Sequence, residues 1–195
     1  AQDNPFTTST TLAVAGTMSS ANTLLVTTTT SITGTMNITS TTGTRTFTGT
    51  VTVAGNWNNS ANEPVSFGAN LTHNSGTLTS GTGTQTFTNA AAQITGTAAT
   101  TFDGGVTANT ALTINKGAAG TAVTINGAFS VGTNLTLTQG TLNLANSVAV
   151  NGTTSVAASQ TLAITGATGT KTFTGTVTIT GTWTNNTVKA PSSFG

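Results

Sequence analysis

The stretch "TKTFTGTVTITGTWT", residues 170–184, alternates between threonine and a second kind of residue from end to end. All even positions are threonine. The odd positions are Lys171, Phe173, Gly175, Val177, Ile179, Gly181 and Trp183. Because successive side chains of a β-strand point to opposite faces, this period of two predicts strands with a hydroxyl face and an apolar face. The apolar face is expected to pack inside the protein.

Glycines divide this stretch into short pieces. An unbroken strand over 170–184 would be about 50 Å long at about 3.4 Å per residue, far beyond the usual strand length. Gly175 and Gly181 interrupt it, as Gly49 and Gly55 interrupt a similar stretch. Glycine and asparagine accommodate the backbone of tight turns. The sequence therefore predicts strands of about five residues separated by Gly/Asn corners.

The stretch belongs to a repeat. "GTRTFTGTVTVAGNWNN" (43–59) returns as "GTKTFTGTVTITGTWTN" (169–185), and a looser copy begins between them at Gly83. The related segments are 43–68, 83–102 and 169–195. Strand-sized repeats favour a single elongated all-β domain over 1–195, a β-solenoid whose rungs stack about 4.8 Å apart.

The interior of this solenoid is expected to hold six apolar residues of the two clearest copies. These are Phe47, Val51, Val53, Phe173, Val177 and Ile179. A β-sandwich or jelly roll, for example a pilin-like subunit with a donor strand, is the alternative fold, because it too needs many short alternating strands. Intrinsic disorder fits less well, since mean hydropathy is +0.10 and net charge only +1.

Charged residues make up 4% of the chain, against about 25% in ordinary soluble domains. They are Asp3, Arg45, Glu63, Asp103, Lys116, Lys171 and Lys189, and His73 is the single histidine. Three scattered acids favour a protein that is not an enzyme, with no catalytic, cofactor-binding or metal-binding residues and no cofactor. A net charge of +1 without a basic run predicts no nucleic-acid partner, and no apolar run is long enough to span a membrane.

Single residues that stand out from the pattern have structural interpretations. His73, Asp103 and Lys116 are expected in turns. Pro64 and Pro191 are expected in loops at matching positions of two repeats.

Trp57 and Trp183 recur at matching repeat positions, which favours a core or corner role over stacking platforms for carbohydrate. An Asn–Lys isopeptide crosslink assisted by Glu63 would suit a surface fibre, but nothing in the sequence brings such groups together.

The threonine stripe has four interpretations. Its hydroxyls solvate an outer face and hydrogen-bond along the ladder, or form a flat ice-binding array, or carry O-linked glycans, or contribute to a carbohydrate-binding surface. N-linked glycans are a further candidate at six sequons. These sequons begin at Asn37, Asn58, Asn70, Asn134, Asn151 and Asn185.

The segments 55–89 and 175–186 resemble the very long Thr/Gly/Asn-rich "β-strand repeat" surface proteins of bacteria. Their repeats alternate T-x-T-F-x-G with G-x-W-x-N; "GTWTN" matches the second motif, and "TQTFTN" matches the first except that Asn89 stands at the glycine position. The resemblance implies an extracellular or cell-surface location and a β-solenoid or related all-β rod. It implies no catalytic residues.

The two ends suggest assembly. The chain begins without Met, as a processed secreted protein or a fragment would, and it stops at 190–195 where the related segment 63–68 continues. Neither end carries the charged cap that keeps solenoids monomeric. We therefore expect a structural subunit or segment of an extracellular filament, sheath or surface fibre that binds itself end to end. The joining mode is either coil stacking or β-strand addition with residues 1–16 as donor. The alternative is a surface adhesin or binding module, including one for ice.

Overall fold

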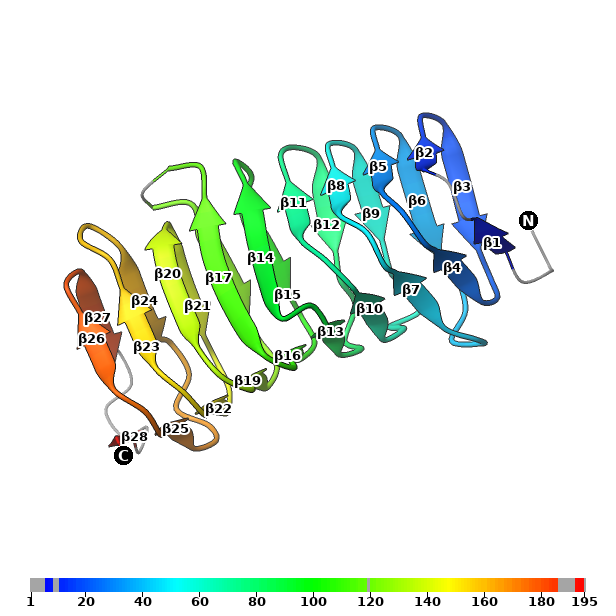
Figure 1. Cartoon of the computed structure of the whole chain (residues 1–195). Coiled ribbons are helices and arrows are strands. Elements are labelled where there is room, and N and C mark those ends of the chain that lie inside the picture. Colours follow the sequence, from blue (N-terminus) through cyan, green and yellow to red (C-terminus); the bar gives the residue numbers. More distant parts are fainter. Residues whose placement is uncertain (1–5, 9–10, 119, 186–191, 195) are drawn as a thin grey trace.

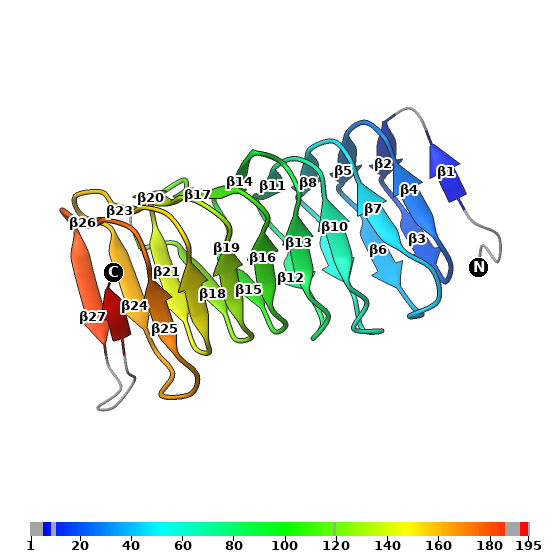
Figure 2. The same cartoon turned by 60° about the horizontal axis from the view of Figure 1, so that its bottom comes forward.

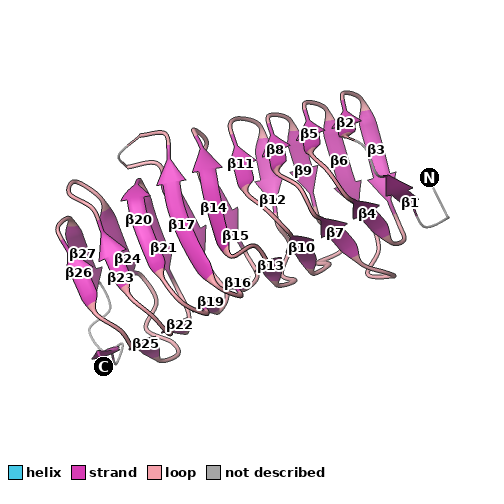
Figure 3. Cartoon of the chain, in the orientation of Figure 1, coloured by secondary structure: helices cyan, strands magenta, loops and turns pink. Residues whose placement is uncertain are grey.

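The computed structural model describes residues 6–8, 11–118, 120–185 and 192–194. Within these residues all regular secondary structure is β-strand, and Figure 3 shows only strands and loops among them. All their strand pairs are parallel, for example β7 (Arg45–Phe47) with β10 (Val65–Phe67). The β-solenoid is confirmed. The sandwich alternative is wrong, because sandwiches and jelly rolls are built from antiparallel strands.

The stretch that opens the sequence analysis forms one full coil. It contains β25 (Lys171–Phe173), β26 (Val177–Ile179) and β27 (Thr182–Asn185), with Gly175 and Gly181 in the corners between them. Each of the three strands belongs to a different face of the solenoid. One short stretch of alternating sequence therefore supplies a strand to each of the three faces.

The faces are parallel sheets that run along the rod (Figure 1). The first face, which Figure 2 turns forward, contains β1 (Phe6–Thr8), β4 (Leu24–Val26), β7, β10, β13 (Gln85–Phe87), β16 (Val106–Ala108), β19 (Phe129–Val131), β22 (Val148–Val150), β25 and β28 (Ser192–Phe194). The second contains β2 (Leu12–Val14), β5 (Thr30–Ile32), β8 (Val51–Val53), β11 (Leu71–His73), β14 (Ala91–Gly96), β17 (Ala111–Lys116), β20 (Leu135–Gln139), β23 (Thr154–Val156) and β26.

The third face consists of two separate sheets. One contains β3 (Thr17–Ser20), β6 (Thr35–Ile38), β9 (Asn56–Asn58) and β12 (Thr77–Thr79). The other contains β15 (Thr100–Phe102), β18 (Ala122–Ile125), β21 (Thr141–Leu144), β24 (Thr161–Ile164) and β27. No ladder joins β12 to β15 in this fully described part of the chain, so the third face is interrupted at the middle of the rod.

The spacing of first-face strands gives the length of a coil. One coil leads from Arg45, which opens β7, to Val65, which opens β10, and the next leads from Val65 to Gln85. The copy of the repeat that begins at Gly83 thus lies two coils after the first. The copy at Gly169 lies six coils after the first, because β25 is six places from β7 in this sheet.

The core consists of inward-facing columns that run along the rod. The rings of Phe47, Phe67 and Phe87 stack at centroid distances of 6.1 and 5.1 Å, and Trp57 packs beside them, 5.4 Å from Phe47. Stacked identical rings arise because each first-face strand pairs in register with the next. Their burial contributes the hydrophobic stabilisation that replaces a globular core.

The predicted interior residues lie inside. Phe47, Val51, Val53 and Phe173 are fully buried, whereas Val177 and Ile179 pack against the core but remain partly exposed. Val177 and Ile179 belong to β26, which is the last strand of the second face among the described residues.

The corner glycines permit the close stacking of coils. A Cβ atom on Gly55 would collide with the carbonyl oxygen of Gly34 in the preceding coil, and Gly76 stands in the same relation to Gly55. A side chain at this corner would therefore push adjacent rungs apart. This contact explains why glycine recurs at this corner although the other residues vary.

The segment predicted as a donor strand takes part in the solenoid of its own chain. β1 pairs with β4, and β2 pairs with β5. The remaining residues of that segment at 1–5 and 9–10, together with Pro191, Asp3 and Lys189, lie outside the described residues.

Candidate functional site

The outer surface carries very little charge. Of the charged residues within the described ranges, Arg45, Glu63, Lys116 and Lys171 are buried, and Asp103 alone is exposed. Among the described residues, those at the surface are mainly threonine, serine, asparagine, glycine and alanine. A surface of this kind presents hydroxyl and amide groups to water or to a neutral partner, with almost no electrostatic steering.

Hydroxyl groups on successive coils bond to each other as predicted for the threonine stripe. The Oγ1 atoms of Thr72 and Thr95 lie 2.8 Å apart on the second face, and those of Thr11 and Thr29 lie 3.1 Å apart. On the third face the Asn58 amide donates to Asn37 Oδ1 at 3.2 Å. These contacts confirm the ladder interpretation at these positions and support the stacking of coils.

Asparagine side chains replace backbone acceptors at several corners. The Oδ1 atom of Asn56 accepts from the backbone N–H of Thr77, one coil further on, at 3.3 Å. Asn62, Asn70 and Asn134 accept from backbone N–H groups of the next coil at 2.9 to 3.0 Å. Asparagine suits these corners because its carbonyl oxygen extends the ladder. This role accounts for two of the sequons, since both Asn70 and Asn134 use their side chains in this way.

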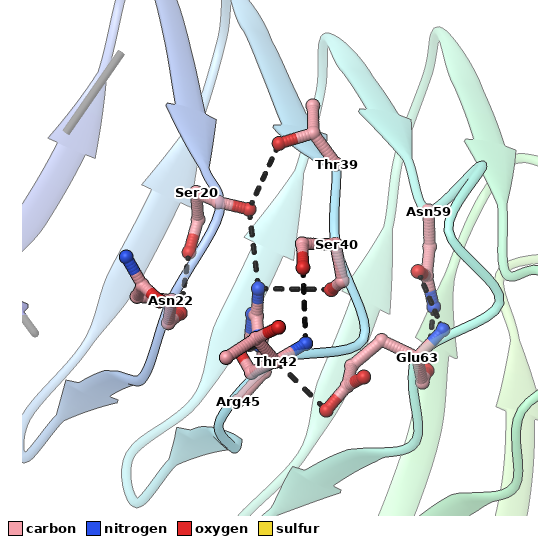
Figure 4. A network of polar contacts seen from close by, with 8 residues as sticks. All are labelled: Ser20, Asn22, Thr39, Ser40, Thr42, Arg45, Asn59 and Glu63. Carbon is pink, nitrogen blue, oxygen red and sulfur yellow. Dashed lines mark hydrogen bonds and ion pairs between the residues drawn. The ribbon is translucent and has the colours of Figure 1, made fainter. Parts of the chain in front are cut away.

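The first buried polar network surrounds Arg45 (Figure 4). Its guanidinium donates to the carbonyl oxygens of Thr42 at 2.6 Å, Ser40 at 3.0 Å and Ser20 at 3.2 Å, and Nη1 lies 3.6 Å from Glu63 Oε1. The side chain points inward and ties the loop before its own strand to the preceding coil. Burial is the main cause that lowers the pKa of Arg45, and the Glu63 carboxylate opposes it.

The same corner recurs with other donors. Lys171 Nζ donates to the carbonyl oxygens of Thr168 at 2.6 Å and Gly169 at 3.0 Å, and Gln85 Nε2 donates to that of Gly83 at 2.9 Å. The three corners share the sequence Gly-Thr followed by a long donor side chain: GTR, GTQ and GTK. The feature common to the three copies is thus a buried donor that satisfies loop carbonyls, with or without a charge.

A further polar cluster connects Asn59, Glu63 and Ser80. Asn59 Nδ2 donates to the backbone carbonyls of Glu63 and Ser80, both at 2.7 Å, and its Oδ1 accepts from the Glu63 N–H at 3.0 Å. This buried amide fixes the loop before β10, which contains Pro64. Pro64 therefore lies in a loop, as predicted.

His73 and Lys116 are not turn residues, and that prediction is wrong. His73 ends β11 and Lys116 ends β17, with both residues buried. Each occupies an inward position of its strand, so the pattern of alternation dictates burial despite the polar side chain. Lys116 Nζ donates to Thr95 O at 2.8 Å and to Thr100 Oγ1 at 3.2 Å, and His73 Nδ1 lies 3.2 Å from the same hydroxyl. Asp103 does lie in a bend after β15, as predicted.

The tryptophans take the core role that was favoured. Trp57 is 2% exposed and contacts Phe47 and Phe67, so its ring offers no platform for a sugar. Trp183 is partly buried and packs edge-on against Phe173 at 5.2 Å. Inward packing thus accounts for most residues that stood out in the sequence.

The surface has a shallow depression of about 190 Å³ on the first face, formed by Thr44, Arg45, Thr46, Pro64, Val65, Ser66 and Thr86. It is smaller than the ligand pockets of about 300–1,000 Å³ that proteins commonly use. Within the described ranges, no three His, Cys, Asp or Glu residues gather as they would around a metal ion, and no helix is long and apolar enough to cross a membrane.

No protein-family model, no curated protein and no solved structure matches this chain. The class of protein is defined by the fold alone: a three-faced parallel β-solenoid built from short stacked coils.

Because the ammonium of Lys116 is buried, the free energy of unfolding is expected to change with pH in the alkaline range. Burial lowers the pKa of Lys116 from 10.5 to about 8. Below about pH 8 both folded and unfolded chains carry this proton, and the cost of burying the charge is fully present. Between about pH 8 and 10.5 the folded chain binds fewer protons than the unfolded chain, so the free energy of unfolding rises by up to about 3 kcal/mol. Burial also lowers the pKa of Lys171, which acts in the same direction.

Urea denaturation at several pH values measures this dependence. Lys116→Met, which keeps the length of the side chain without its charge, is expected to flatten the curve and to be at least as stable as wild type at neutral pH. A wild-type stability that falls between about pH 8 and 10 would contradict the assignment.

Proposed function

We propose that the chain is a structural segment of an extracellular filament, sheath or surface fibre, and that it lengthens by adding coils to the end of the solenoid. The observation that carries the proposal is the in-register stacking of parallel coils along the described rod, beneath an exterior on which Asp103 is the one exposed charge among the described residues. Val177, Ile179 and Trp183 continue columns whose earlier members are fully buried, yet these three remain partly exposed. A further coil stacked on β26 and β27, whether from a continuation of the chain or from a second copy, would bury them and pair the strand edges.

The sparse outer charge supports the same proposal. Open strand edges are normally protected by lysine, glutamate or proline, and the coil that contains β26 and β27 has its single charged residue, Lys171, buried inside. Association would therefore depend on backbone hydrogen bonds and apolar contact, with little dependence on salt. Stacking of coils from a second copy is the favoured mode. In the alternative, β-strand addition by residues 1–16, β1 and β2 would have to leave β4 and β5 of their own chain.

Negative-stain electron microscopy and sedimentation of the purified chain test this function, and regular fibres are expected. Val177→Asp places a charge on the inward column of this coil and is expected to yield discrete rods. Thr178→Asp is the matched control, because the same charge then lies on the exposed side of the same strand. Wild-type protein that remains monomeric over a wide concentration range would refute the proposal, as would equal fibre formation by both variants.

A binding surface is the second candidate, supported by the outward column of the second face. Thr113, Thr136, Ser155 and Thr178 follow one another in register along β17, β20, β23 and β26. Such an uncharged hydroxyl array suits a neutral, periodic partner such as a glycan surface or ice. Isolated short rods in the microscope, together with thermal hysteresis or retention on a glycan array, would favour this candidate over the fibre.

A further inference from the structure

The rod has a discontinuity at its middle. The sheets of the first and second faces continue through β13–β16 and β14–β17, whereas no ladder connects the described strands β12 and β15 on the third face (Figure 1). Leu78, the inward residue of β12, remains partly exposed, while the equivalent Trp57 one coil earlier is buried. We call the place where β12 faces β15 the joint.

Side chains bridge the joint in place of a ladder. On one side the His73 Nδ1 atom lies 3.2 Å from Thr100 Oγ1, which joins the coil of β11 to β15. On the other side the backbone N–H of Asp103 donates to the buried hydroxyl of Ser80 at 2.9 Å. At the corner, Ala98 N–H donates to the His73 carbonyl at 3.0 Å, and the Thr97 hydroxyl donates to the Asn74 carbonyl at 2.9 Å. The joint therefore depends on few contacts, one of which contains the single histidine of the chain.

A buried cation lies directly at this bridge. Lys116 Nζ donates to the same Thr100 hydroxyl at 3.2 Å, so His73 and Lys116 share one partner inside the solenoid. The neighbouring strands β8, β9, β12, β14 and β15 contain no charged residue. Of the two acids in the described ranges, Glu63 pairs with Arg45, and the exposed Asp103 accepts from Asn126. Neither of these described carboxylates therefore balances the His73–Lys116 pair.

We propose that the joint is opened by protons: when His73 becomes charged beside Lys116, the third face loosens between β12 and β15 while the first and second faces hold the rod together. The charged imidazole would face an ammonium without a balancing acid, and separation of β12 from β15 admits water to both. The rod then bends or becomes locally accessible at a defined place, without general unfolding. This property is independent of whether the chain forms fibres.

The direction of the pH effect follows from the surroundings of His73. Burial, and then the charge of Lys116, lower the pKa of His73, and backbone groups of Gly76, Ser75 and Ala99 act in the opposite direction. In the window from about 6.5 down to this lowered pKa, the open or unfolded form binds more protons than the closed form. Closure of the joint is therefore favoured above about pH 6.5 and is lost as the pH falls through that window.

Hydrogen exchange with mass spectrometry tests the joint at about pH 7.5 and about pH 5, after correction for the intrinsic exchange rates. Protection of peptides that cover residues 77–79 and 97–102 is expected to be lost at the lower pH, because the open form binds the additional proton on His73. Peptides that cover β21 and β24 should change little. His73→Gln, neutral at both pH values, should remove the local effect, and Lys116→Met should reduce it.

Two results would overturn the proposal. One is exchange at the joint that responds to pH equally in wild type and in His73→Gln. The other is an NMR titration of His73 in the folded wild-type protein, which needs no variant. The proposal expects a pKa below about 6.5. A value at or above this reference would show that the folded protein favours the charged imidazole.

Discussion

Phe67→Ala is expected to lower the free energy of unfolding by about 3–5 kcal/mol, the range typical of deleting a buried phenylalanine. Phe67 is 3% exposed and lies at the centre of the aromatic cluster. Its ring centroid is 5.1 Å from that of Phe87, 6.0 Å from Trp57 and 6.1 Å from Phe47. The substitution removes three ring contacts at once, and the rigid stack of coils leaves the cavity little freedom to collapse.

The control for this prediction is Ser66→Ala, one position earlier in the same strand. Ser66 is half-buried on the outward side of β10, so its truncation is expected to change stability by no more than about 0.5 kcal/mol. Urea denaturation followed by far-UV circular dichroism measures both variants. Equal stability of the two would mean that Phe67 does not face the core and that the register of the first face is wrong.

Arg45→Ala is expected to cost about 3–5 kcal/mol, because it removes one partner of a buried ion pair. The loss leaves the Glu63 carboxylate, 6% exposed, without its cation, and it leaves the carbonyls of Ser20, Ser40 and Thr42 without this donor. Arg45→Lys should retain part of the stability, since Lys171 satisfies two loop carbonyls at the equivalent corner.

A double-mutant cycle separates the ion pair from the loop hydrogen bonds. Glu63→Gln in the Arg45→Ala background removes the unpaired charge, so the double variant should be more stable than the sum of the two single effects by about 1 kcal/mol or more. Strict additivity in urea denaturation would show that Arg45 acts through the loop carbonyls alone.

The period of the coil was only partly visible in the sequence. The copies that begin at Gly43, Gly83 and Gly169 are several coils apart, and the intervening coils differ in composition. Any apolar residue of suitable size serves at an inward position, as Phe47 and Val131 show in one column of the first face. Corners tolerate insertions because they lie outside the ladders, and the resulting variation in coil length blurs the repeat.

The inward polar residues could have been found from parity. Lys171 occupies the same odd positions as Phe173 and Val177, and Arg45 stands in the same relation to Phe47. Alternation alone therefore indicates that these cations point inward. What it does not reveal is their partners, which come from loop carbonyls and from neighbouring coils. His73 and Lys116 also fit the inward parity of their strands, but the neighbouring Asn74 and Gly117 made them look like turn residues although both are buried.

Local chemistry determined the all-β class, the outward threonines, the glycine corners and most of the core, because side-chain alternation and turn preferences act within a few residues. Tertiary structure alone decided the three-faced cross-section, the convergence of His73 and Lys116 on Thr100, and the missing ladder between the described strands β12 and β15. These features join residues that belong to different coils and lie far apart in the sequence. Their geometry depends on how each coil packs against the preceding coil.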